Sequence, residues 1–393
     1  MAAMSRYKLE TLSTDQFEPR EKFVDIVGIQ IDSNGNVTGW AANDRRKLGF
    51  YWPVGSKPIE KLVYVTSSCK ADCEPRGMDD QGRVFLYCKG PVRHVIFTPA
   101  SGKYQELSLT LDQLFEFRGA GGDSWGVGYS ASHRCLTGAR IGPDLKSSPE
   151  SLLPAVGDRS SIAVAVNSKG VAAGASSVLS AGGFAGEDVS NRLGRAAIWM
   201  PDKQEAELIP APAKVSWVPQ IGRAINEQRT VVGSTSPIAP NPPNACYQPS
   251  PITDMTSTRA FVSTPFLTRW RTEKLPPVKG DATLTTLTAT GINCHDQVIG
   301  VRDGVDCGNN VLLSGSRAIL WERQRGKWIA SALDWLCDRP SSLSGLCEGQ
   351  VILSQAWAIN DAGQIAGKGS CNDGTGVSRR FAYRLTPTTT AQI

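Results

Sequence analysis

The stretch AINDAGQIAG, Ala358–Gly367, recurs along this chain in several variants. A typical copy has an apolar residue, then a short polar turn that begins with Asn or Asp, then glycine and a second apolar run. Asn and Asp open such turns by hydrogen bonding to nearby backbone, and glycine supplies the positive φ that they require. The stretch therefore predicts the first hairpin of a repeated β unit.

The copies are spread over most of the chain. Clear copies begin at Ile31, Met78, Val166, Ile225 and Ile292, and a divergent copy, SASHRCLTG, begins at Ser130. We expect the turn positions to be Asp32, Asp79, Ala131, Asn167, Asn226, Asn293 and Asn360. Their spacing averages roughly 55 residues, slightly longer than a typical propeller blade.

A second phrase follows most hairpins and predicts two more strands in each unit. Its apolar and aromatic copies are GFYWP at Gly49, RHVIF at Arg93, RAAIW at Arg195, RAFVS at Arg259, RAILW at Arg317 and RRFAY at Arg379. Most lead through a polar turn, such as PASGKY, into a fourth apolar segment. A recurrent arginine is expected to secure each unit, with the turn Asn or Asp as its partner, at Arg93, Arg195, Arg259, Arg317 and Arg380.

The ends of the chain predict how such a repeat would close. The last unit stops after its third strand, FAYRLTP, whereas an orphan strand, Tyr7–Ser13, precedes the first unit. Pairing this strand with Phe381–Leu385 would leave no open sheet edge. We therefore predict an all-β fold over residues 1–393: one seven-bladed β-propeller of four-stranded antiparallel blades. The segment SLTLDQLFEF, after Leu107, is the best helix candidate.

The two phrases together resemble the bacterial extracellular repeat proteins known as the HAF family. The tripeptide RAF at Arg259 stands where the family's namesake motif would be, and the resemblance covers about six of the seven units. It implies a repeat fold and a secreted or cell-envelope location, and it carries over no catalytic residue. The third unit departs from the pattern, since it lacks both the turn Asn and the Arg-Ala phrase.

Composition narrows the function classes. The 393 residues include 39 glycines and carry a net charge of +5. This net charge is small and the charged residues are evenly spread, which does not favour nucleic-acid binding. No apolar run reaches the roughly 18 residues of a membrane span. The N-terminus, MAAMSRYKLE, has no apolar core of a signal peptide.

The connections between strands differ in length on the two sides of the predicted ring. The first-to-second and third-to-fourth turns are short, whereas the second-to-third connection of the fifth unit runs over Ser234–Thr258. Long loops on a rigid scaffold often carry binding residues. We therefore expect the long-loop face to be the functional face.

Eight of the ten cysteines are expected on that face, namely Cys69, Cys73, Cys88, Cys246, Cys307, Cys337, Cys347 and Cys371. This distribution favours disulfides and an oxidising compartment, with free thiols as the alternative. Sequence does not determine connectivity; Cys337 with Cys347 and Cys69 with Cys73 are the best local pairs. A zinc site is disfavoured because there is no CxxC pair.

Aromatic and cationic residues supply the binding candidates. Trp125, Trp217, Trp335 and Trp357 are expected near the long-loop face or the inner strands, where they could stack on sugars or on a protein partner. Arg76 and Arg223 occupy the repeat position of Trp357, near the central channel, and could bind an acidic group. Trp52, Trp199 and Trp321 are expected in the core.

These observations favour a secreted or envelope-associated binding module for a glycan or a protein surface, with no cofactor and no metal. The alternative is a lyase or hydrolase that uses carboxylates and Tyr, with Asp123, Glu187 or Asp306 as its acids. A scaffold without a small ligand is a third possibility. The three histidines, His94, His133 and His295, are expected to lie too far apart for a triad or a multi-histidine metal site.

Overall fold

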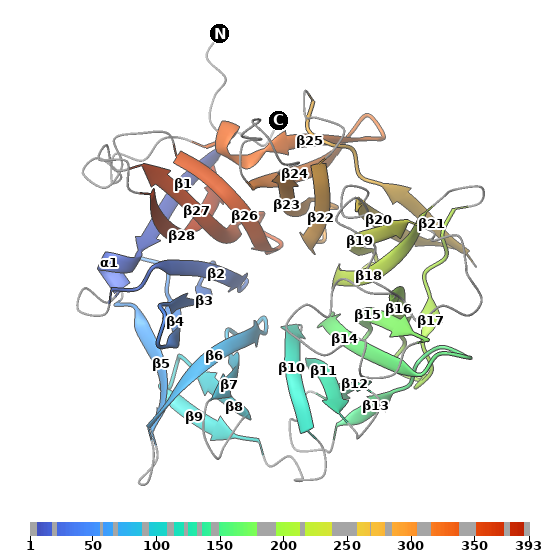
Figure 1. The fold of residues 1–393 in the computed structure, drawn as a ribbon, viewed down its shortest axis with the longest axis horizontal. Helices are drawn as coiled ribbons and strands as arrows, with labels where there is room; N and C mark the ends of the chain where they lie inside the picture. The colour runs from blue at the N-terminus through green and yellow to red at the C-terminus, as the bar shows by residue number, and fades with distance from the viewer. Residues whose placement is uncertain are drawn as a thin grey trace.

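This computed structural model describes residues 6–17, 22–55, 58–65, 70–88, 94–107, 114–121, 125–131, 136–142, 149–178, 194–212, 217–237, 258–267, 269–279, 285–304, 316–337, 351–372 and 378–388. Within these ranges the strands form five four-stranded antiparallel sheets and one eight-stranded sheet, β2 to β9. Figure 1 shows the sheets arranged around a centre, as in a β-propeller. The eight-stranded sheet consists of two successive four-strand units that the β5–β6 pairing joins.

We number the four-strand units one to seven in chain order. The first strands, which border the centre in Figure 1, are β2 (Asp25–Ile31), β6 (Lys70–Met78), β10 (Leu114–Gly121), β14 (Ser160–Val166), β18 (Trp217–Ile225), β22 (Thr285–Ile292) and β26 (Val351–Ile359). The second strands are β3 (Val37–Ala42), β7 (Val84–Cys88), β11 (Trp125–Ala131), β15 (Ala172–Ser177), β19 (Val231–Pro237), β23 (Val298–Gly304) and β27 (Ile365–Asn372).

The third and fourth strands complete the units toward the outside. The third strands are β4 (Lys47–Trp52), β8 (His94–Thr98), β12 (Leu136–Ile141), β16 (Gly194–Trp199), β20 (Ala260–Phe266), β24 (Arg317–Gln324) and β28 (Ser378–Pro387). The fourth strands are β5 (Glu60–Val65), β9 (Lys103–Glu106), β13 (Glu150–Leu152), β17 (Glu207–Leu208), β21 (Arg269–Lys274), β25 (Lys327–Ala332) and β1 (Tyr7–Ser13). Two short helical segments, α1 (Thr14–Phe17) and η3 (Leu333–Trp335), follow fourth strands.

The N-terminal strand lies where the sequence predicts it. In the antiparallel register of β1 with β28, Tyr7 is opposite Pro387 and Ser13 is opposite Phe381. Arg384 ties the two ends together, since its Nε donates to Glu10 Oε2 at 2.7 Å. The expected pairing of the two chain ends is therefore confirmed.

The third unit corrects two expectations. Residues Leu114–Phe117 of the helix candidate lie in strand β10, because their alternating apolar residues suit a strand next to the adjacent sheets. The segment SASHRCLTG is not the first hairpin of its unit, since it begins in the last residues of the second strand, β11, and ends in the third strand, β12. The first hairpin instead joins Gly121 to Trp125.

The repeated turn Asn has two roles, and only the first is visible in the sequence. Its Oδ1 accepts backbone N–H groups of its own turn, as Asn226 does from Gln228 at 3.1 Å and from Thr230 at 2.9 Å. Its Nδ2 donates to the carbonyl of the turn residue in the next unit. These inter-unit bonds run from Asn167 to Asn226, from Asn226 to Asn293, from Asn293 to Asn360 and from Asn360 to Asp32.

This hydrogen-bonded series, which we call the Asn belt, links units four, five, six, seven and one. It ends at Asp32, because a carboxylate has no amide donor to pass on. The Oδ2 of Asp32 instead accepts from Asn36 Nδ2 at 2.7 Å. In unit two, Arg83 Nε donates to Asp79 Oδ2 at 2.8 Å. Each acidic turn residue thus has a donor four residues later.

The recurrent arginines do secure the units, but the expected partner is wrong. Three of them pair with acidic residues in the connections between units or at the start of the next first strand: Arg195 with Asp158, Arg317 with Asp334, and Arg380 with Asp25. Arg259 differs, since its Nη1 donates to the carbonyl of Thr258 at 3.1 Å. Arg93 lies outside the described residues. The turn Asn and Asp already have partners in their own turns: their Oδ1 atoms accept from backbone N–H groups, and the Oδ2 atoms of Asp32 and Asp79 accept from the side chains of Asn36 and Arg83.

The core lies between neighbouring sheets, as it must when each sheet buries both faces. Trp199 and Trp321 are fully buried, as expected, and each indole N–H donates to a backbone carbonyl, that of Leu153 and that of Pro276. Trp52 is half-buried, with the Arg384 guanidinium 4.7 Å from its ring centroid. None of the helices in the described ranges has the length and hydropathy of a membrane span.

Candidate functional site

All seven first strands carry a β-bulge at the same repeat position. The pairing with the second strand skips one residue three positions before the turn residue, at Ile29, Arg76, Arg118, Val164, Arg223, Thr290 and Trp357. A bulge leaves one residue without a ladder partner and redirects its side chain. We call these seven positions the bulge ring. None of the seven side chains is fully buried.

The bulge ring aligns the third unit, which sequence comparison misaligned. Three residues after Arg118 is Gly121, so Gly121 and not Ala131 holds the turn position. A Cβ at Gly121 would lie 2.2 Å from the carbonyl oxygen of Val166 in the neighbouring first strand. An Asn therefore cannot fit at this turn, which explains why this copy of the motif is degenerate.

Units two and three share a further motif that sequence analysis missed. Glu-Pro-Arg-Gly ends at Gly77 and Glu-Phe-Arg-Gly ends at Gly119, and in both cases a tyrosine follows the arginine by 11 residues. The guanidinium carbon of Arg76 lies 5.6 Å from the ring centroid of Tyr87, and that of Arg118 lies 5.3 Å from that of Tyr129. The repeated Glu-x-Arg-Gly spacing is the signal that could have revealed this pair.

The unit-two arginine lies in a charged and aromatic cluster. Glu74 Oε2 is 3.0 Å from Lys47 Nζ and 3.5 Å from Arg76 Nη2, so two cations share one carboxylate. The Arg76 side chain keeps 23% of its surface exposed, whereas that of Glu74 keeps 10%. The rings of Tyr87 and the buried His94 are 5.9 Å apart.

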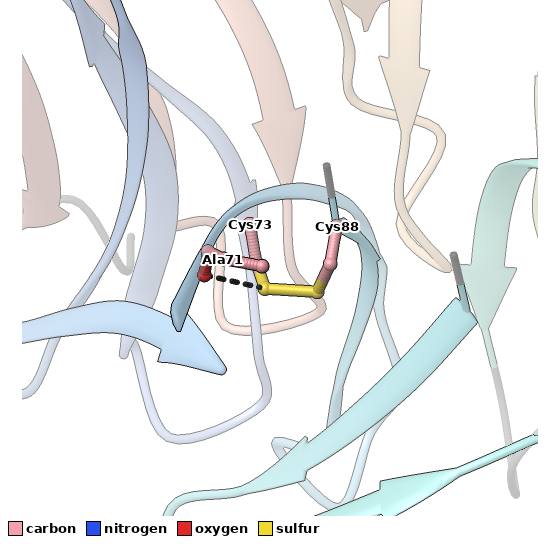
Figure 2. Close-up of a disulfide and its surroundings, with 3 residues drawn as sticks. All are labelled: Ala71, Cys73 and Cys88. Carbon is pink, nitrogen blue, oxygen red and sulfur yellow. Dashed lines mark hydrogen bonds between the residues drawn. A yellow bond between two sulfur atoms is a disulfide. The ribbon is translucent and has the colours of Figure 1, made fainter. Parts of the chain in front are cut away.

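A disulfide braces this cluster. Figure 2 shows Cys73 bonded to Cys88, the residues directly opposite each other on β6 and β7. The next rung of the same ladder pairs Glu74 with Tyr87. The cross-link therefore fixes the two strands one residue away from the groups that contact Arg76.

The observed cysteine pairing corrects both expected pairs. Cys73 bonds to Cys88 rather than to Cys69, which lies outside the described residues, because strand register places Cys73 and Cys88 opposite each other. Cys337 is a thiol whose Sγ donates to the carbonyl of Leu333 at 3.0 Å, so the expected bond to Cys347 is also wrong. Cys371 is disulfide-bonded as well, and its partner is none of the other cysteines in the described ranges.

The four candidate tryptophans lie in different environments. Trp125 begins the second strand of unit three rather than a connector, and its Nε1 donates to Ser168 in the neighbouring turn. Trp217 is only 7% exposed, with Lys274 over its ring, so it is not placed on an open surface. Trp335 in η3 is 60% exposed and Trp357 on β26 is 37% exposed. Trp357 is therefore the candidate tryptophan that lies in the bulge ring.

Of the remaining candidate site residues, some lie within the described residues and others lie outside them. Arg223 is half-buried in the bulge ring of unit five, as its repeat position predicts. The proposed acids of an enzyme, Asp123, Glu187 and Asp306, lie outside the described residues, as does His133. No group of three or more His, Cys, Asp or Glu side chains within the described ranges is arranged to hold a metal ion.

A separate cavity of about 540 Å³ lies between the turns of units six and seven. Its lining includes His295, Gln297, Asp361 and the bidentate ion pair of Arg6 with Glu322, whose two N–O distances are 2.8 Å. Burial alone would raise the pKa of Glu322, but the hydrogen bonds from Arg6 and Gln297 outweigh it and lower this pKa. Arg6 and Glu322 thus neutralise each other's charge within the protein.

Comparisons with known proteins identify no family. No family model matches this chain, and no curated protein does. Among solved structures, a prolyl endopeptidase superposes with a TM-score of 0.49 at 10% identity over 94% of this chain and 51% of its own. YCF48 from Cyanidioschyzon merolae gives 0.48 at 9% identity over 98% and 99%, and the tricorn protease gives 0.40 at 10% over 93% and 34%. This chain thus spans about half of the prolyl endopeptidase and a third of the tricorn protease.

Proposed function

We propose that this chain is a seven-bladed β-propeller, completed by its N-terminal strand, that acts outside the cytoplasm as a binding module for an acidic glycan. The observation that carries the proposal is the bulge ring. It presents arginine at three of its seven positions, Arg76, Arg118 and Arg223, and an exposed indole at Trp357. Guanidinium groups recognise carboxylates through paired hydrogen bonds, and indoles stack on pyranose faces.

Several features support this interpretation of the site. The bulges repeat in every unit while their side chains differ, which is typical of a scaffold that varies a recognition position. The arginines lie on strands that border one centre, so their fields add there. The resemblance to the HAF repeat proteins and the disulfide of Cys73 with Cys88 favour a secreted or cell-envelope location.

The proposal is tested on an array of acidic and neutral glycans. We expect wild-type protein to retain acidic glycans in a salt-sensitive way, and the triple variant Arg76→Gln, Arg118→Gln, Arg223→Gln to lose them. A control with the same change in net charge replaces three exposed cations, Arg45, Arg269 and Lys327, with Gln. If the triple variant binds acidic glycans as well as wild type does, the bulge ring is not the binding site.

A further inference from the structure

We infer that Arg76 and Arg118 form one paired subsite that takes two consecutive carboxylates of a linear uronate chain. This inference rests on the proposed function and names the class of ligand for the same site. It starts from the duplication of the Glu-x-Arg-Gly motif and its tyrosine in neighbouring units two and three. A duplicated recognition element suits a ligand whose own charged groups repeat.

The backbone places the two arginines side by side. A Cβ built on Gly77, the residue after Arg76, would lie 2.4 Å from the backbone nitrogen of Ala120 and 2.9 Å from the carbonyl carbon of Gly119, the residue after Arg118. The strands β6 and β10 therefore touch directly beside the two bulges. Glycine at position 77 permits this approach, because any side chain there would separate the strands. Glycine at position 119 permits the next approach around the centre, since a Cβ there would lie 2.2 Å from the carbonyl oxygen of Val164 in β14.

Two guanidinium groups on touching strands favour a bound anion. Like charges repel each other, and a carboxylate that reaches both groups would offset the repulsion. In unit two, Lys47 is a second cation at the carboxylate of Glu74, beside Arg76.

Each arginine is held in place before a ligand arrives. The Arg118 Nη2 donates to Tyr129 Oη at 3.1 Å, and its guanidinium carbon lies 5.3 Å from the centroid of the same ring. The Arg76 guanidinium lies beside the ring of Tyr87, whose strand is cross-linked by the disulfide one rung away. Such fixed geometry lowers the entropy lost on binding and selects ligands with a matching carboxylate spacing.

A uronate chain fits this arrangement better than an acidic peptide does. Its carboxylates repeat on rigid rings, so the spacing between them is fixed before binding. An acidic peptide offers carboxylates on flexible side chains and must lose their rotamer freedom to bind. The two classes are separated directly by experiment.

The test measures binding of galacturonate and mannuronate monomers, dimers and trimers by titration calorimetry. For wild type we expect one of the two dimers to bind about tenfold more tightly than its monomer, because a second charge-assisted contact is made. Either single variant, Arg76→Gln or Arg118→Gln, should reduce dimer affinity to that of the monomer, and the double variant should bind neither. Arg45→Gln, an exposed position, serves as the matched control and should match wild type.

The outcomes separate the inference from the proposed function. Equal monomer and dimer affinities in wild type would overturn the pairing, as would tighter binding of hexaglutamate than of any uronate. If the array finds other acidic glycans that need the arginines but no uronate binds, the proposed function stands and the uronate inference fails. Should a Gln variant not fold, Arg76→Lys and Arg118→Lys keep the charge and are expected to retain monomer binding while losing the tenfold gain.

Discussion

The Asn belt predicts a large effect for the smallest possible substitution, Asn226→Asp. The change preserves shape, and Oδ1 can still accept from the backbone of Gln228 and Thr230. It replaces the Nδ2 donor, which lies 3.1 Å from the carbonyl of Asn293, with an oxygen that can only accept when ionised. Asn226 is 5% exposed, so water does not compensate for the loss.

The expected magnitude follows from the groups left behind. Losing the hydrogen bond costs about 1 kcal/mol, and leaving a buried carbonyl opposite a carboxylate oxygen adds about 1–3 kcal/mol. We therefore expect Asn226→Asp to unfold at a temperature lower by on the order of 5 °C at pH 7. Asp79, the acidic residue at the same turn position in unit two, illustrates the cost of a buried carboxylate there. Burial raises the pKa of its carboxyl although Arg83 opposes the shift.

Acid should partly rescue the variant, and differential scanning calorimetry between pH 7 and pH 4.5 measures this. Burial raises the pKa of the introduced carboxyl, so protonation restores a donor toward Asn293 and narrows the gap to wild type. The control is Asn43→Asp, because Asn43 Oδ1 accepts from the backbone of Arg45 and Arg46 at 2.9 Å in each case. An Asn226→Asp protein as stable as wild type at pH 7 would refute the energetic role of the belt.

Three further predictions concern the ends of the chain and the cysteines. Hydrogen bonds from Arg6 and Gln297 outweigh burial and lower the pKa of Glu322, which gives stability that is present above pH 4.5 and is lost as the pH falls through the folded-state pKa. Arg6→Gln should thus lower the unfolding temperature at pH 7, and its difference from wild type should shrink as the pH falls below 4.5; a constant difference would contradict this role of Arg6. Burial, with a hydrogen bond to Asp361, raises the pKa of the Cys294 thiol to about 11. Peptide-resolved alkylation of Cys294 at pH 8 should therefore be slow in wild type and faster in Asp361→Asn. Equal alkylation rates in the two proteins would contradict the role of Asp361. Replacing both cysteines of the disulfide in Figure 2 with serine should lower the free energy of unfolding by about 3 kcal/mol for a loop of this length, as thermal unfolding can measure. An unchanged unfolding temperature would show that the cross-link adds no stability.

Much of the fold could be predicted because its elements are local. The Asx turns, the four strands in each unit and the pairing of β1 with β28 follow from residue patterns and from the need to leave no open edge. The third unit could not be aligned, because contact with Val166 requires glycine at position 121 and this removes the Asn that marks the other turns. That contact joins two strands in different units, and no local pattern records it.

The candidate site was predicted in part. Arg76, Arg223 and Trp357 were found by their repeat position, but Arg118 was missed because its unit was misaligned. The disulfide partner of Cys73 depends on strand register, which places Cys88 opposite it over 15 residues of separation. Sequence proximity had favoured a cysteine only four residues away.

The turn and the bulge together explain how one repeat can keep its fold and vary its surface. The turn residue is fixed by bonds within its own unit and, in the belt, by bonds to the next unit. Because the bulge always lies three residues before it, the bulged side chain has the same height in every unit. The residue after the bulge lies where neighbouring strands meet, and it is Gly or Ala in six of the seven units. The bulged residue itself ranges from Ile to Arg, Thr and Trp. Packing therefore constrains the flanking residue and leaves the bulged position free to vary from unit to unit.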